Sequence, residues 1–412
     1  MKRVVLIFFF TMALLAGCAA PEPVVDLPTP QMTEPAVTQP ADTPALRPTD
    51  PPASPTLAAT AEPTQPAQPF GWIAFIGSDE NLWLVDPVTG EQQQLTQDAT
   101  PTQPEPGTAT VRYCCAEWSS DGRLLAYQRE MGTPVTEGAQ YEFSLWVYDI
   151  DSGSAGLVLE NQMTAGFAWR PGTHVLTYGL SIPGEYFTTR GSPAPEYAQG
   201  IWAVDADRGV PFELVPPERG LALVAPQWSR DGRFISFDEV LYMEGRGYFA
   251  YYDMEAQEYT SWEKAIGMYD WSEDSERIAY DTLTYTASGT ERIYLNNRQG
   301  TEEQAFSPEY EQGYAFSPVF APQNDRLAFL AELHGPDSSQ YTLFVQMLDG
   351  GEPRALGVFE QVMELAWSQD GERLVLSTGP YENRQIVVVR VANGAIQVLA
   401  GGYQPAWQPA SP

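Results

Sequence analysis

The chain has 412 residues, of which 54 are acidic and 22 are lysine or arginine, so its formal net charge is −32. Such a charge repels nucleic acids and anionic lipid surfaces. It favours cations or basic partners, or simply keeps an exported protein soluble. The sequence has two histidines and three cysteines, which are too few to favour a metal centre built on those residues. We therefore expect no nucleic-acid partner, no bound metal and no cofactor.

The N-terminus has the features of an export signal. Lys2 and Arg3 precede an apolar run from Val4 to Leu15, which is too short for a stable membrane span. The string Leu-Ala-Gly before Cys18 resembles the lipobox of bacterial lipoproteins, which implies cleavage after residue 17 and a lipidated Cys18. An ordinary signal peptide with a chance cysteine is the alternative. Several acyl chains on one residue would anchor the protein durably outside the cytoplasm, on the periplasmic or cell-surface side.

Residues 18–69 hold the lipidated N-terminus and a segment rich in Pro, Thr, Ala and Gln. Such a composition cannot bury a core, so we expect a disordered stalk. Three regions result: a signal peptide over 1–17, a lipidated linker over 18–69 and a folded domain over 70–412.

The folded region consists of repeats. Each repeat begins where an apolar run ends on an aromatic anchor, and the anchors are Trp118, Trp169, Trp228, Trp271, Phe320, Trp367 and Trp407. Their separations are 51, 59, 43, 49, 47 and 40 residues. This period is typical of propeller blades. We expect the anchors to pack between neighbouring blades, as large buried aromatic side chains do.

The second repeat illustrates the predicted blade. A turn at residues 120–122 separates the anchor strand from a strand at Leu124–Tyr127, and Leu145–Asp149 supplies a third strand. A glycine turn then leads to a fourth strand. Glycine recurs in that turn, where a positive φ is expected, at Gly90, Gly153, Gly209, Gly300, Gly351 and Gly394. The exception is Gln257 in the fourth repeat, so the hairpin at that position is the least certain of these predictions.

The two ends of the folded region complement each other. Trp72–Phe75, Leu82–Asp86 and Gln92–Thr96 read as second, third and fourth strands without a first one, whereas Tyr403–Trp407 reads as a lone first strand. We therefore predict an all-β fold: a single seven-bladed β-propeller of four-stranded antiparallel blades, closed by a C-terminal strand that joins the N-terminal blade. Closure of this kind protects sheet edges.

The repeat pattern Trp-Ser-x-Asp-Gly, followed by a basic residue and an apolar triplet, resembles that of the TolB-like, WD-repeat-like bacterial β-propellers. The resemblance covers Phe70–Pro409 and implies the fold rather than a function, because one fold hosts many activities. TolB itself carries an α/β domain ahead of its propeller and associates with a peptidoglycan-linked lipoprotein. This sequence shows no counterpart of that domain, so we do not expect that role.

Cys114 and Cys115 are adjacent and have no other partner once Cys18 is lipidated. In an oxidising compartment they could form a vicinal disulfide, stay reduced or pair between molecules. Successive side chains of a strand point to opposite faces, so a vicinal bond would require a local distortion of the backbone.

Catalytic motifs are scarce. His174 falls in a turn and His334 in a loop, far from any cluster with metal-ligand spacing. Propeller lyases that act on pectic sugars would need a histidine-rich metal site. Prolyl peptidases would need an added hydrolase domain, and the sequence shows neither feature. Carboxylate pairs such as Glu302 and Glu303 could serve acid/base chemistry, but nothing selects one pair. The sequence leaves open whether the protein is an enzyme, but it favours a protein that is not one.

The repeats differ mainly in loop length. Three long loops, predicted at residues 97–111, 128–142 and 179–199, fall on one face of adjacent blades. These loops and their counterparts carry Tyr141, Phe143, Tyr186, Phe187, Tyr197, Tyr242, Tyr285 and Tyr381, with Arg129 and Arg190 among them. Tyrosine with arginine is typical of recognition surfaces, although the tyrosines could instead pack their own loops.

These features together predict a membrane-anchored, extracytoplasmic lipoprotein. Its propeller would be a binding or scaffolding module for an envelope protein, a peptide or a glycan, and we expect it to be a monomer. The alternative is a carbohydrate-active hydrolase or lyase that uses carboxylates on the loop-rich face.

Overall fold

The computed structural model describes residues 71–101, 107–135, 139–181, 199–240, 247–282, 292–311, 313–334 and 339–409. All of them belong to one compact unit, Gln65–Pro412. The predictions for residues 1–69, including Cys18, lie outside the described residues. The described part consists of β-strands and one 3-10 turn, η3 (Tyr381–Asn383).

Twenty strands form five antiparallel sheets of four. They are β4 (Thr110–Trp118), β5 (Leu124–Pro134), β6 (Ala139–Asp149) and β7 (Ser154–Glu160); β8 (Thr164–Trp169), β9 (Val175–Leu180), β10 (Ile201–Asp205) and β11 (Pro211–Val215); β12 (Leu223–Trp228), β13 (Phe234–Val240), β14 (Gly247–Asp253) and β15 (Glu258–Ser261); β16 (Tyr269–Trp271), β17 (Arg277–Asp281), β18 (Ile293–Asn297) and β19 (Gln304–Ala305); β20 (Gly313–Phe320), β21 (Arg326–His334), β22 (Ser339–Met347) and β23 (Arg354–Phe359).

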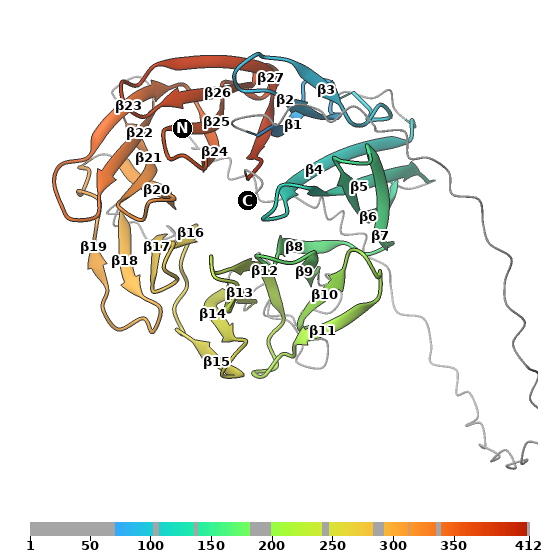
Figure 1. Cartoon of the computed structure of the whole chain (residues 1–412), viewed down its shortest axis with the longest axis horizontal. Helices are drawn as coiled ribbons and strands as arrows, with labels where there is room; N and C mark the ends of the chain where they lie inside the picture. Colours follow the sequence, from blue (N-terminus) through green and yellow to red (C-terminus); the bar gives the residue numbers. More distant parts are fainter. Residues whose placement is uncertain are drawn as a thin grey trace, which may run out of the picture. The chain divides into compact units, whose positions relative to one another are not determined.

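A sixth sheet has seven strands in the order β24-β25-β26-β27-β1-β2-β3. Its strands are β24 (Val362–Trp367), β25 (Arg373–Thr378), β26 (Gln385–Arg390), β27 (Ile396–Trp407), β1 (Ile73–Gly77), β2 (Leu82–Val85) and β3 (Gln92–Gln94). The sheets stand radially around a centre, with the anchor strands innermost (Figure 1). This arrangement is the predicted all-β propeller.

The C-terminal strand closes the ring as predicted. The first half of β27 pairs with β26, with Val387 opposite Val398, and its second half pairs with β1, with Ile73 opposite Trp407. The predicted lone strand is therefore continuous with the last strand of the preceding blade, because no turn interrupts residues 396–407. If this sheet is divided within β27 it makes two blades. That division gives the seven blades of the sequence analysis, and the count itself stays a prediction.

Gln408 adds hydrogen bonds between the two ends of the folded region, beyond this strand pairing. Its side-chain Oε1 accepts the Trp72 N–H at 2.7 Å and its Nε2 donates to the Gly122 carbonyl at 2.6 Å. Its own N–H donates to the Trp72 carbonyl. One residue thus joins the start of the first blade to the turn of the next.

The Ser-x-Asp-Gly string builds the first turn of three blades, at residues 119–122, 229–232 and 368–371. In the third sheet, Ser229 Oγ donates to Asp231 Oδ1 at 2.6 Å and accepts the Phe234 N–H at 2.9 Å. Gly232 takes a φ of +69° there, which glycine adopts without strain. In the second turn of that sheet, Gln257 takes the role of glycine with a φ of +57°, and its N–H donates to the Asp253 carbonyl at 2.8 Å. The hairpin that was the least certain prediction from the sequence is therefore present in the structure.

Six of the seven anchor aromatics are buried, and the seventh, Trp367, is partly buried against the core. Trp169 Nε1 donates to the carbonyl of Glu117, the residue before the preceding anchor, at 3.0 Å. Trp228 Nε1 reaches the equivalent carbonyl of Ala168 through the Thr177 hydroxyl, with hydrogen bonds of 2.9 and 2.8 Å. Each of these two indoles therefore packs in the core and also bonds, directly or through a hydroxyl, to a backbone acceptor of the preceding blade, as buried tryptophan requires.

The innermost strands other than β16 share a β-bulge that the sequence analysis did not predict. Pairing shifts register three residues before the anchor, for example between Val224 and Gln227 in β12. The residue at that position has a positive φ in six strands: Cys115, Gly166, Ala225, Ser317, Glu364 and Gln404, with values from +51° to +85°. A bulge leaves one residue outside the ladder and bends the strand. These residues form a ring along the innermost strands.

Candidate functional site

Only part of the predicted binding face can be located. Tyr141, Phe143 and Tyr381 lie among the described residues, as does Arg129, which pairs with Asp98 at 3.0 Å. The remaining members of the face lie outside them: Tyr186, Phe187, Arg190, Tyr197, Tyr242 and Tyr285. The site is therefore built from the connections that the structure describes.

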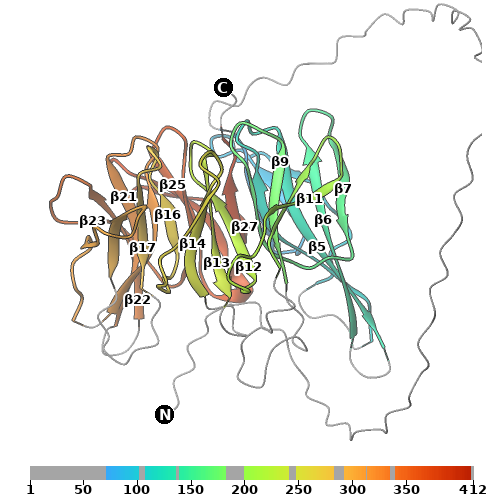
Figure 2. The ribbon, with the colours of Figure 1, turned by 90° about the horizontal axis from the view of Figure 1, so that it is seen from below.

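One predicted loop is wrong. Residues 128–142 are mostly strand, because β5 continues to Pro134 and β6 begins at Ala139, with these two residues paired. The outer part of this hairpin holds Gly132, Thr133 and Pro134 on one strand and exposed residues from Ala139 to Glu142 on the other, so it lacks the apolar alternation that marks a half-buried strand. The backbone ladder nevertheless continues, and the hairpin projects from the ring (Figure 2). Tyr141 and Phe143 consequently lie on a strand.

The hairpin carries a hollow of about 240 Å³, here called the hairpin hollow, which is lined by Gln140, Tyr141, Glu142, Phe143 and Asn161. The rings of Tyr141 and Phe143 are stacked, with centroids 6.5 Å apart, and Tyr141 is 55% exposed. Gly132 pairs opposite Tyr141, and a side chain there would contact the tyrosine ring. Glycine at this position therefore leaves room for the ring across the strand.

A second hollow, of about 250 Å³, lies where β27 joins β1 to β26. We call it the seam hollow, and it is lined by Ser78, Glu80, Tyr381, Glu382, Arg384, Gly402 and Tyr403. The Arg384 guanidinium lies 5.0 Å from the ring centre of Tyr381 and 5.6 Å from that of Tyr403, which are cation–π distances. Tyr381 is 42% exposed.

Tyr403 holds one wall of the seam hollow in place. Its hydroxyl donates to Glu80 Oε2 at 2.7 Å. Burial raises the pKa of Tyr403, and the neighbouring Glu80 carboxylate raises it further, so the phenol stays protonated as a donor. The sequence analysis assigned Tyr403 to a strand and did not select Glu80 or Arg384. The available signal was the polar string Tyr-Glu-Asn-Arg in the connection between a second and a third strand.

Both hollows belong to the same face of the propeller. The seam hollow takes residues from the β1–β2 and β25–β26 connections, and the hairpin hollow from the β5–β6 hairpin. Each joins the second and third strands of a sheet, and such connections emerge on one side of a propeller. The face that the sequence singled out therefore holds two hollows with exposed tyrosines on neighbouring sheets.

Carboxyl groups of the innermost strands have raised pKa values. Burial raises the pKa of Glu117 to about 8, although the Trp169 N–H donates to this carboxyl. Burial also raises the pKa of Asp270, although its carboxyl forms an ion pair with Arg230 at 2.8 Å. The Asp270 carboxyl accepts a hydrogen bond from the Phe320 N–H at 2.8 Å. Both carboxyls thus bind the backbone N–H of the next blade's anchor. Their first role is to join blades.

Two further carboxyls have raised pKa values. Burial raises the pKa of Asp238 on β13 to about 7. It also raises the pKa of Glu364 on β24, against hydrogen bonds from the Ser377 hydroxyl and the Gln404 N–H. Glu364 is thereby tied to the next bulge residue of the ring.

The two histidines have acidic neighbours. His174 Nε2 lies 3.0 Å from Asp121 Oδ2, and its Nδ1 lies 3.3 Å from Asp207 Oδ2. Burial opposes its positive charge, but the two aspartates outweigh burial and raise the pKa of His174. His334 lies 3.5 Å from Glu332. In the part of the chain that the structure describes, no group of three or more His, Cys, Asp or Glu side chains could hold a metal ion.

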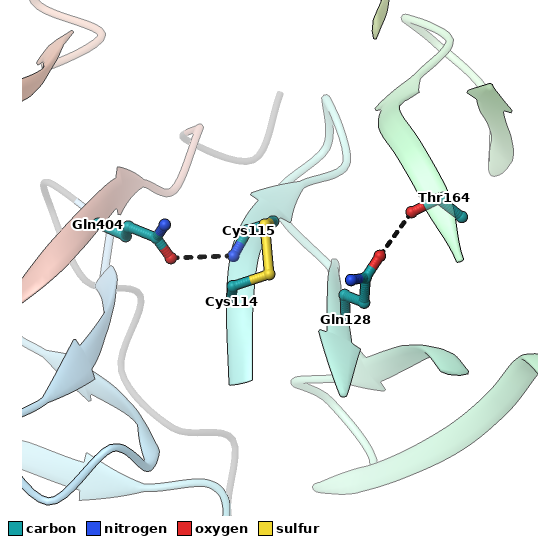
Figure 3. The surroundings of a disulfide bond; sticks show 5 residues. All are labelled: Cys114, Cys115, Gln128, Thr164 and Gln404. Atoms are coloured by element: carbon teal, nitrogen blue, oxygen red, sulfur yellow. Dashed lines mark hydrogen bonds between the residues drawn. A yellow bond between two sulfur atoms is a disulfide. The ribbon is translucent and has the colours of Figure 1, made fainter. Parts of the chain in front are cut away.

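Cys114 and Cys115 lie at the bulge of β4, and their sulfurs are joined in the structure (Figure 3). Cys115 has a φ of +64°, which is the backbone distortion expected for a vicinal pair. That the bond forms in the protein in its own compartment stays a prediction. Among the described residues, no helix is long and apolar enough to cross a membrane.

No protein-family model matches the sequence, and no curated protein matches it. Solved structures do. A prolyl endopeptidase is 16% identical with a TM-score of 0.56, over 81% of this chain and 50% of that one. An oligogalacturonate lyase in complex with manganese is 15% identical with a TM-score of 0.54, over 80% and 84%.

TolB from Acinetobacter baumannii is 14% identical with a TM-score of 0.46, over 73% of this chain and 82% of that one. Identities this low bear on the fold alone. The radial arrangement of the antiparallel sheets is itself that of a β-propeller (Figure 1), which is the architecture that the resemblance of the repeats to TolB-like proteins implies.

Proposed function

We propose that this chain is an exported, lipid-anchored protein whose propeller binds an envelope protein, a peptide or a glycan. The observation that carries the proposal is the pair of hollows on one face, each with a tyrosine that is 42–55% exposed. Tyrosine next to arginine dominates the binding energy of many recognition surfaces. The acidic net charge of −32 favours partners with basic or hydroxyl-bearing groups.

The seam hollow suits one residue of an extended ligand. Its volume of about 250 Å³ is below the roughly 300–1,000 Å³ of pockets that enclose a whole small molecule. The Tyr381 ring offers an exposed face for stacking, and Glu80 and Glu382 can accept hydrogen bonds from hydroxyl or amino groups. One sugar unit or one side chain fits this description. A longer ligand could reach further contacts on the same face.

The alternative function, a hydrolase or lyase, has less support. The carboxyls of Glu117 and Asp270 have raised pKa values, as a general acid requires. Both, however, accept the backbone N–H of the next blade's anchor residue, so ring assembly already explains their burial. Release of reducing ends or unsaturated products from envelope glycans would support the enzyme.

The binding proposal is tested by capture of solubilised envelope material on the immobilised protein, followed by mass spectrometry and glycan analysis. Tyr381→Ala and Tyr141→Ala should each weaken capture by about fivefold or more, since truncation of an anchor residue costs more than about 1 kcal/mol. Val210→Ala is the matched control, because Val210 is 69% exposed and lies in a turn between a third and a fourth strand. Equal capture by all four proteins would contradict the proposal.

A further inference from the structure

Adjacent cysteines fall at one special position of the propeller. Cys115 is the bulge residue of β4, and Cys114 precedes it. In five other innermost strands the same position has a positive φ although it holds Gly166, Ala225, Ser317, Glu364 or Gln404. The blade therefore produces this backbone conformation without any sulfur–sulfur bond.

The bulge removes the usual obstacle to a vicinal disulfide. In a regular strand the side chains of neighbouring residues point to opposite faces. At Cys115 the φ of +64° turns one residue out of the ladder, so that its sulfur lies on the same side as that of Cys114 (Figure 3). Cys115 is exposed and Cys114 is partly exposed, so a reagent can reach the pair.

Neighbouring residues hold this backbone independently of the sulfurs. The Cys115 N–H donates to Gln404 Oε1 on β27 at 3.1 Å. Cys114 pairs with Gln128 on β5, and Gln128 Oε1 accepts the Thr164 hydroxyl of the next sheet at 2.7 Å. Figure 3 shows these two contacts on either side of the pair. Breaking the sulfur–sulfur bond removes none of them.

We propose that Cys114 and Cys115 form a reversible dithiol–disulfide couple on the innermost strand, which changes redox state without opening the ring. The inference goes beyond the proposed binding function. Its co-reactant is a dithiol reductant in one direction and a disulfide oxidant in the other.

Reduction proceeds by thiol–disulfide exchange at the exposed sulfur. A thiolate of the dithiol attacks Cys115 Sγ, the sulfur–sulfur bond breaks and Cys114 leaves as a thiolate. The second thiol of the reductant then attacks its own sulfur in the mixed disulfide and releases Cys115. The reductant becomes a disulfide, and two electrons and two protons pass to the cysteine pair. Oxidation is the reverse.

The experiment uses the full chain with Cys18→Ser, which leaves this pair as the only cysteines. Without reductant, iodoacetamide should label neither residue, and after dithiothreitol it should label both. Phenylarsine oxide should then bind one per chain, since arsenic bridges two close thiols with loss of water. The melting temperatures of the two forms should agree within a few degrees. Two labels without reductant, a dimer-linked peptide or unfolding on reduction would overturn the proposal.

Transplanted pairs test the role of the bulge. In a chain that also carries Cys114→Ser and Cys115→Ser, we compare Val224→Cys with Ala225→Cys, at the β12 bulge, against Gln92→Cys with Gln93→Cys, in the regular strand β3. The bulge pair should form an intramolecular disulfide, and the β3 pair should remain open to alkylation. Bonds in both pairs, or in neither, would contradict preorganisation by the bulge. If the β12 variant unfolds, Phe316→Cys with Ser317→Cys supplies a second bulge pair for the same comparison.

Discussion

Individual side chains join the blades by binding the backbone of their neighbours. Trp169 donates its indole N–H to the Glu117 carbonyl, and the Glu117 carboxyl accepts the Trp169 backbone N–H. The sequence identified the anchor aromatics, because they recur at the blade period. It could not identify Glu117 as their partner, because Asp270 is the one other acidic residue directly before an anchor, whereas Ala168 and Gln227 take the equivalent positions in the next two repeats.

Glu117 should make the stability of the ring depend on pH. Its pKa is about 8 in the folded protein, compared with 4.5 ordinarily, so the folded state binds this proton more tightly than the unfolded chain. The stabilisation is complete below about pH 4.5 and is lost as the pH rises through 8. Compared with the parent, Glu117→Gln should melt higher at pH 8 and change less between pH 5 and pH 8. A variant with the parent's full pH dependence in thermal melts would disprove this role.

Lipid anchoring through Cys18 is a prediction from the sequence. Because this cysteine follows Leu-Ala-Gly, we expect Cys18→Ser to prevent lipidation and to move the protein from the membrane fraction to the soluble fraction. Immunoblots of fractions washed with salt give the distribution. Cys114→Ser is the matched control and should leave the protein in the membrane fraction. Continued membrane association of Cys18→Ser would show that the lipoprotein interpretation is wrong.

At the scale of strands and hairpins, the sequence predicted the elements that bury apolar residues. It missed the outer half of the β5–β6 hairpin, where backbone pairing continues without an alternation of apolar and polar residues. It also missed the bulges, since a residue such as Ala225 or Ser317 carries no side-chain signal for a positive φ. The seam hollow was missed in part because it joins residues about 300 positions apart, Glu80 and Arg384.

The β5–β6 hairpin offers a test of function at this scale. Replacing residues 131–142 by Asn-Gly would join Glu130 to Phe143, which are already paired opposite each other. Most of the removed side chains that the structure describes are exposed, so the melting temperature should change by only a few degrees. Capture of the partner should fall by about fivefold or more, as for Tyr141→Ala. A large loss of stability with full capture would assign the hairpin to the core instead.

At the scale of the whole molecule, closure depends on β27. This strand completes the sheet of β24–β26 and joins it to β1, and it supplies Tyr403 to the seam hollow and Gln404 to the cysteine pair. The sequence predicted this pairing, because the first three strands lacked a partner and the last strand lacked a sheet. The volume and lining of the hollows depend on side-chain positions, which a repeat pattern does not contain.

Deletion of residues 402–412 tests this closure most directly. The deletion removes the half of β27 that pairs with β1 and also removes Gln408. We expect the melting temperature to fall by 10 °C or more, on the order of a few kcal/mol for a domain of this size, and the exposed edge of β1 to promote association between chains. Calorimetry and light scattering give both quantities. A truncated protein that melts with the parent and stays monomeric would contradict closure of the ring by its C-terminal strand.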